Sequence, residues 1–140
     1  MTDTQDREGP QELVAESEGQ GLIRLWLLRM LTSRSVMSSF VRESDFRDDD
    51  IARELGLDRL IGVTANAFNR SQIISDLYAM KAELEQRSAI LKIPEYISKN
   101  CSFVADLLNL GAVERCVLEF EVMRCEYSVL NDVIRIDAIK

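Results

Sequence analysis

The 140-residue chain contains no histidine. This absence removes the usual base for serine or cysteine nucleophiles and the commonest protein ligand of transition metals. The three cysteines form no CxxC pair, so a zinc site would lack its usual ligand spacing. Neither a Walker A motif nor a G-x-G-x-x-G motif occurs. We therefore expect no catalytic residue, no cofactor site and no metal site in this segment, and we do not expect it to be an enzyme.

Proline and glycine are also scarce, with two and six residues, whereas hydrophobic residues make up 46% of the chain. Apolar residues recur at helical spacing from Gly21 onwards. These features predict an all-α fold, a compact bundle of about six helices. The longest apolar stretch, Leu22 to Leu31, contains two arginines and is shorter than the about 20 apolar residues that cross a bilayer. We expect no membrane span and, with an odd number of cysteines and an acidic amino terminus, a cytoplasmic protein.

The formal net charge of −7 is concentrated at the amino terminus. Residues 1–18 hold six carboxylates and one arginine, a charge of −5, which leaves −2 for the rest of the chain. Residues 1–19 are also poor in large apolar groups, which is typical of a disordered acidic tail. Residues 20–140 are predicted to form a single helical domain. Neither part has the basic excess that binding to a phosphate backbone requires.

Three local features allow more than one interpretation. Asp48, Asp49 and Asp50 precede a short helical pattern, where aspartates cap a helix amino terminus, although a carboxylate cluster also suits a divalent cation. We favour capping. Trp26, the only tryptophan, is expected to be a core anchor rather than a platform for a ligand. Cys116 lies among apolar residues and is expected to be an inert core thiol rather than a reactive one.

The stretch from Ser102 to Met123 reads as helix, corner and helix, the shape of a helix-turn-helix. Gly111 stands at the corner, where a glycine is free to adopt positive φ. The second helix carries three glutamates and few arginines, whereas a recognition helix needs basic and amide side chains facing the bases and phosphates. The charges therefore do not favour DNA binding.

Residues 100–123, N-C-S-F-V-A-D-L-L-N-L-G-A-V-E-R-C-V-L-E-F-E-V-M, resemble a segment of bacterial AAA+ ATPases that lies amino-terminal to the ATPase core. The matching positions are Asn100, Leu107, Leu110, Gly111, Glu114, Arg115, Val117, Leu118 and Phe120. The stretches L-W-L-L-R-M-L (25–31) and D-D-I-A-R-E-L-G-L (49–57) also lie where such proteins have an amphipathic helix and a short helix ending in glycine. The absence of a Walker motif departs from that family.

The resemblance implies that this chain is the non-catalytic amino-terminal part of a longer ATPase, which recognises a protein substrate or an adaptor. A homo-oligomer would then form through the parent chain. Apolar residues that continue to the final D-A-I-K also suggest a segment of a longer protein. The partner-binding residues stay unassigned, although the helices 22–31 and 113–123 are the faces we would test. The alternative is a stand-alone helix-turn-helix regulator that binds DNA or a protein.

Overall fold

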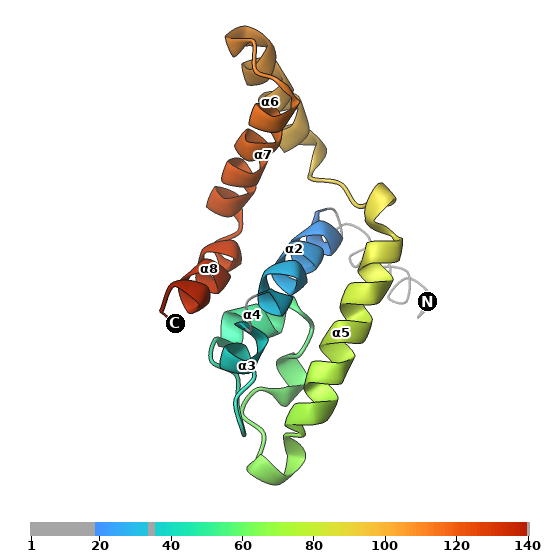
Figure 1. Cartoon of the computed structure of the whole chain (residues 1–140), viewed down its shortest axis with the longest axis vertical. Coiled ribbons are helices and arrows are strands. Elements are labelled where there is room, and N and C mark those ends of the chain that lie inside the picture. Colours follow the sequence, from blue (N-terminus) through green and yellow to red (C-terminus); the bar gives the residue numbers. More distant parts are fainter. Residues whose placement is uncertain (1–18, 34–35, 140) are drawn as a thin grey trace, which may run out of the picture.

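The computed structural model describes residues 19–33 and 36–139, which form an all-α fold, as predicted (Figure 1). The α-helices in these residues are α2 (Gln20–Thr32), α3 (Val36–Phe40), α4 (Asp49–Glu54), α5 (Arg70–Gln86), α6 (Glu95–Leu108), α7 (Ala112–Glu126) and α8 (Val129–Ile139). Short 3₁₀ turns at Asp58–Leu60, Ala65–Ala67 and Ser88–Ile90 lie in the connections. The described residues include no β-strand, only an isolated bridge between Val41 and Phe46.

The predicted disordered tail, residues 1–19, lies outside the described residues except for its last position. Gly19 is buried and caps α2 with φ of 80°. A Cβ atom there would lie 2.9 Å from Cδ of Pro94, so both the backbone conformation and the close contact favour glycine. Gly19 therefore belongs with the packed residues that follow it.

Helix α2 is the centre of the body, which consists of α2–α5 and α8 (Figure 1). It packs against α5, α3 and α8, so its apolar side chains are covered from several directions. The buried residues are Ile23, Leu25, Leu27, Leu28 and Leu31. The helix is apolar on nearly every side because it is central to the body, so these five side chains are covered by the chain's own helices.

The two arginines of α2 reach oxygen atoms at the edge of the body. Arg24 Nε donates to the Glu54 carbonyl at 2.7 Å, which satisfies a free carbonyl at the end of α4. Arg29 forms a bidentate pair with Glu85 of α5, with distances of 2.9 and 2.7 Å. Hydrogen bonding to Arg29 lowers the pKa of the Glu85 carboxyl. The arginines thus tie α2 to α4 and α5 without burying an unpaired charge.

Three buried phenylalanines form an aromatic cluster in the body. Phe40 at the end of α3 stacks on Phe46 with ring centroids 5.4 Å apart, and Phe46 meets Phe68 edge-on at 5.1 Å. Side-chain caps begin the neighbouring helices, and the cap of α4 by an aspartate agrees with the prediction. Asp48 accepts from Ile51 N at 3.1 Å and Asn69 accepts from Gln72 N at 3.1 Å.

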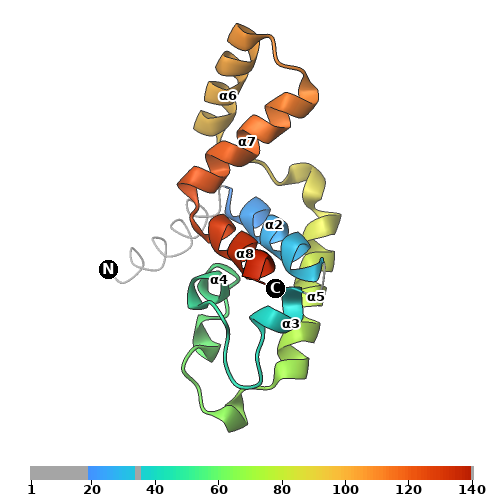
Figure 2. The same cartoon turned by 60° about the vertical axis from the view of Figure 1, so that its left-hand side comes forward.

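Helices α6 and α7 form a hairpin that projects from the body, and α8 then returns the chain to pack against α2, α3 and α4 (Figure 2). The α6–α7 hairpin (residues 95–126) is thus an excursion between two helices of the body. None of the described helices has both the length and the hydropathy needed to cross a bilayer.

Candidate functional site

The turn of the α6–α7 hairpin differs from the prediction. The residue with positive φ is Asn109, at 55°, and Leu110 N donates to the Ala105 carbonyl at 2.8 Å. This closes α6 in the manner of a Schellman turn. Gly111 instead has extended backbone (φ −79°, ψ −179°) and starts α7, where its N–H donates to Oε1 of Glu114 at 3.3 Å. The prediction that Gly111 supplies the positive φ was wrong, because asparagine also tolerates that region.

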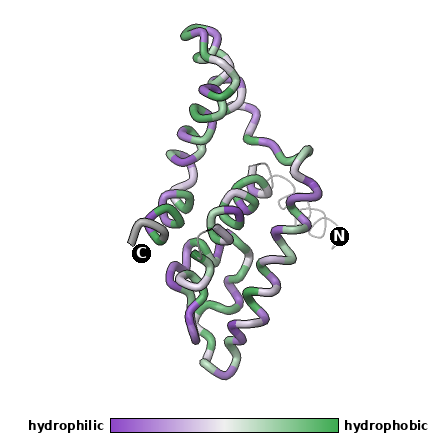
Figure 3. The backbone as a smooth tube through the Cα atoms, viewed as in Figure 1, coloured by the Kyte–Doolittle hydropathy of each residue, from purple (hydrophilic) through white to green (hydrophobic). Residues whose placement is uncertain are grey.

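The outer part of the hairpin exposes large apolar side chains. Leu107 is 73% exposed, Val113 75% and Phe103 60%. We call the exposed set the hairpin surface: Phe103, Val104, Leu107 and Leu108 of α6 with Val113 and Val117 of α7. Hydrophobic residues occur along the hairpin as well, including the part that projects away from the body (Figure 3).

Helical spacing explains why α6 cannot cover its own apolar residues. Ile97, Cys101 and Ala105 follow each other at i, i+4 and i+8 and are buried. Val104 and Leu108 continue that face, while Phe103 and Leu107 lie on the adjoining side of the helix. The apolar arc of α6 is therefore wider than one neighbouring helix can cover, and α6 packs mainly against α7.

Helix α7 is anchored at one end and uncovered at the other. Near the body, Met123 is fully buried and Phe120 packs against Trp26, with ring centroids 5.4 Å apart. One and two turns towards the tip of the hairpin, Val117 and Val113 have no such cover. The apolar residues of α7 thus attach the helix to the body at Phe120 and Met123, whereas those nearer the tip of the hairpin are exposed.

The cysteines follow the same division. Cys101 is buried between the hairpin helices, and burial, more than the nearby Glu119 carboxylate, raises the pKa of its thiol. Cys116 is exposed, which corrects the prediction of a core thiol. The prediction assumed that its apolar neighbours Val113 and Val117 were themselves buried. Because they lie at the surface, Cys116 does too.

Acidic side chains outnumber basic ones beside the hairpin surface, where Arg115 of α7 is the one basic side chain between Asn100 and Val117. Between Asn100 and Glu114 the only ionisable side chains with a formal charge are Asp106 and Glu114. Further along α7, Arg115 pairs with Glu119 at 3.3 Å and Arg124 pairs with Glu121 at 2.7 Å. Among the residues that the structure describes, neither Asp106 nor Glu114 has a lysine or arginine at ion-pair distance. An acidic edge thus flanks the hairpin surface.

A groove of about 980 Å³ separates the base of the hairpin from the body. Its lining includes Trp26, Leu84 and Leu91 together with Arg24, Arg87 and Lys92. Ile90, 71% exposed, lies at the same place on the connection between α5 and α6. The groove is wide open, and its apolar lining is continuous with the Trp26–Phe120 contact that attaches the hairpin.

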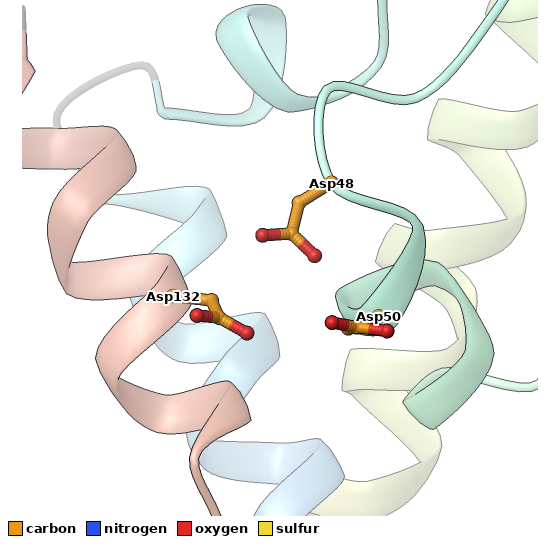
Figure 4. A group of neighbouring side chains, drawn as sticks. All are labelled: Asp48, Asp50 and Asp132. Carbon is orange, nitrogen blue, oxygen red and sulfur yellow. The ribbon is translucent and has the colours of Figure 1, made fainter.

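Three aspartates from distant parts of the chain meet where α4 and α8 pack against each other. Carboxylate oxygens of Asp48, Asp50 and Asp132 lie within 4.8 Å of one another, two from the start of α4 and one from α8 (Figure 4). The sequence placed Asp48 and Asp50 together but gave no sign of Asp132. Asp48 is engaged as the cap of α4, Asp50 pairs with Arg53 and Asp132 pairs with Arg135. Each carboxylate therefore has a hydrogen-bond or ion-pair partner within the body.

The closeness of the three carboxylates predicts that stability depends on pH. Burial and the Asp48 carboxylate raise the pKa of Asp132 above its ordinary value of 3.8. The native state therefore binds this proton more tightly than the unfolded chain does. The contribution of Asp132 to the free energy of unfolding falls as the pH rises through the raised pKa. Replacing Asp132 with asparagine should raise the free energy of unfolding at pH 7 by about 0.5–1 kcal/mol. The gain, measured by urea unfolding, should shrink as the pH falls towards 4.

Asp49→Asn is the matched control, because Asp49 lies in the first turn of α4 outside the cluster. Removing its charge loses a favourable interaction with the helix dipole, so this variant should not be stabilised. Equal stabilisation of both variants at pH 7 would show that general acidity, rather than the cluster, is responsible.

No protein family, curated protein or solved structure matches this chain.

Proposed function

We propose that this chain is a non-catalytic protein-interaction domain that binds its partner through the hairpin surface. The observation that supports the proposal is the exposure of six large apolar side chains on an element that projects from an otherwise well-packed body. A projecting helical hairpin leaves both of its helices accessible to another chain. The fully buried centre of a protein interface is more apolar than the rest of a protein surface.

The alternative of a DNA-binding helix-turn-helix has less support from the charges. A reading helix needs basic groups available for phosphates and bases, whereas Arg115 and Arg124 of α7 are paired with glutamates of the same helix. The tip carries Asp106 and Glu114, which would face the phosphates with like charge. The apolar hairpin surface, by contrast, is suited to a protein.

The assignment to a AAA+ parent is the more specific part of the proposal. It depends on the resemblance over residues 100–123, which implies an ATPase core beyond Lys140 and a domain in the cytoplasm. A protein substrate or an adaptor of that ATPase would then be the partner. Sequencing the gene past Lys140 tests the assignment directly. A Walker A motif in the same reading frame is expected, and a stop codon immediately after Lys140 would rule out the AAA+ parent but not the interaction surface.

Substitution of the hairpin surface tests the interaction itself. The double variant Phe103→Ser/Leu107→Ser should change the free energy of unfolding by no more than about 0.5 kcal/mol, since both side chains are largely exposed in the native state. Thermal unfolding followed by circular dichroism measures this. A loss of several kcal/mol would mean that these residues belong to the core.

Photo-crosslinking in the source cells then reports on the partner. A benzophenone side chain at position 107 should give one discrete adduct, and the same group at Tyr78, an exposed aromatic position on α5, should not. Adducts that are identical from the two positions, or absent from both, would remove the support for a dedicated surface on the hairpin.

A further inference from the structure

We infer that the groove between the base of the hairpin and the body binds the chain's own residues 12–18, E-L-V-A-E-S-E, which we call the acidic segment. These residues directly precede Gly19, the first residue that the structure describes. The inference goes beyond the proposed function and does not depend on the hairpin surface. Three features of the molecule lead to it, namely the place where the chain meets the groove, the apolar lining and the charges.

The described chain begins at the groove itself. Gly19 is part of the lining, together with Gln20 and Gly21 of α2. Leu13 is six residues before Gly19, so even an extended chain would keep its Cα atom within about 22 Å of Gly19. A tether this short holds a segment at an effective concentration in the millimolar range. An affinity that would be weak for a separate peptide is therefore enough to keep the groove occupied for much of the time.

The lining of the groove includes apolar side chains that the described residues cover only in part. Trp26, Leu91 and Ile93 pack against the core but are partly buried, and Ile90 is 71% exposed. Leu13 and Val14 are the only large apolar residues between Thr2 and Glu18. Burial of these two side chains against the lining would remove apolar surface from water on both sides of the contact.

Basic side chains outnumber acidic ones along the groove, with Arg24, Arg87 and Lys92 against Glu95 and Glu119. Both glutamates and Arg87 are already paired with side chains outside the lining, at distances between 3.2 and 3.7 Å. Among residues 19–33 and 36–139, Arg24 and Lys92 have no carboxylate at ion-pair distance.

The acidic segment supplies the charge that these two cations lack. It contains three glutamates and no lysine or arginine, a charge of −3. Complementary charges favour its association with the groove. The same segment of a second copy would have the same charge and the same apolar residues, but it would lack the tether. The chain's own segment is therefore the favoured occupant.

A bound segment would tie the hairpin to the body. The lining comes from α2 and the end of α5 on one side, and from the start of α6 and Glu119 of α7 on the other. The segment would thus add contacts across the junction that the Trp26–Phe120 pair already spans.

Quenching of Trp26 fluorescence by acrylamide, a neutral quencher, tests the inference on the full 140-residue chain. Trp26 is the only tryptophan and lines the groove, so its emission reports directly on cover at this place. A groove covered half of the time should admit the quencher about twofold more once the segment is released. We expect this increase in the quenching constant for Leu13→Ser/Val14→Ser and a similar increase for Glu12→Gln/Glu16→Gln/Glu18→Gln. Thr2→Ser/Thr4→Ser, at the far end of the same tail, should leave quenching unchanged.

Zero-length crosslinking with a carbodiimide locates the segment. Lys92 should be joined to glutamates of the acidic segment, with a yield that does not depend on protein concentration, and Leu13→Ser/Val14→Ser should abolish this adduct although it keeps every charge. Lys81 and Lys99 are controls within the same chain, because each has an ion-pair partner four residues away, at 3.7 and 3.2 Å. They should react with those partners rather than with the segment.

Other outcomes contradict the inference in different ways. A Lys92 adduct whose yield rises with protein concentration would make the segment of a second copy the occupant. Survival of the adduct in Leu13→Ser/Val14→Ser would reduce the attraction to charge alone, without a bound segment. Unchanged quenching in both tail variants, with no adduct of Lys92 while the control pairs react, would show that the acidic segment does not occupy the groove. None of these results bears on the hairpin surface, which the crosslinking from position 107 tests separately.

Discussion

Replacing Phe40 with alanine should lower the free energy of unfolding by about 3–5 kcal/mol, the range for large aromatic-to-alanine changes in a packed core. Phe40 is fully buried, and its ring stacks on Phe46, which in turn contacts Phe68. These residues come from the end of α3 and from two connections with little regular structure. Loss of the Phe40 ring therefore leaves a cavity and also removes a contact that holds the two connections against the body.

Urea unfolding followed by circular dichroism measures the effect of Phe40→Ala. For a domain of this size the melting temperature should fall by roughly 10–20 °C. Phe40→Leu is the matched control, since it keeps most of the buried volume and should cost less than half as much. A change of less than about 1 kcal/mol for Phe40→Ala would show that the aromatic cluster is not part of the cooperative core.

Replacing Trp26 with alanine should cost about 2–3 kcal/mol, less than a fully buried aromatic residue because Trp26 is only partly covered. Its ring joins α2 to Phe120 of α7, so the variant should also loosen the attachment of the hairpin. Hydrogen exchange in α6 and α7 should then increase more than in α5, which packs along α2 independently of this contact.

Trp26→Phe retains an aromatic ring at the contact and should preserve most of the protection in the hairpin. A uniform increase in exchange across the whole chain of Trp26→Ala would indicate that Trp26 supports the body alone. An increase confined to α6 and α7 would show that the hairpin is a separately cooperative unit held by this contact.

Local rules of helix formation were sufficient to predict much of the fold. The helical spacing of apolar residues from Gly21 onwards predicted the all-α fold, and Asp48 stands where an N-cap residue was expected. Trp26 is partly buried and packs against the core, in agreement with its predicted role as an anchor. These features depend on the residues themselves and their nearest neighbours along the chain.

Burial of an amphipathic helix depends on whether another element lies against it, and the sequence does not contain that information in local form. Leu28 and Leu107 are equally apolar and occupy equally helical patterns, yet Leu28 is fully buried and Leu107 is largely exposed. The same limit explains Cys116, which we expected in the core. Asp132 could not be associated with Asp48 and Asp50 from the sequence, because about 80 residues separate them and only the docking of α8 brings them together.

The return of α8 to the body has a consequence for synthesis on the ribosome. Helices α2, α3 and α4 emerge first but lack part of their packing until α8, the last described helix, reaches them. At about 5–20 residues per second, the intervening segment from α5 through α7 takes several seconds to translate. During that interval the apolar faces that await α8 are open to water, and the growing chain is most exposed to chaperones and to misassociation. Closure of the body is thus delayed until α8 has been synthesised.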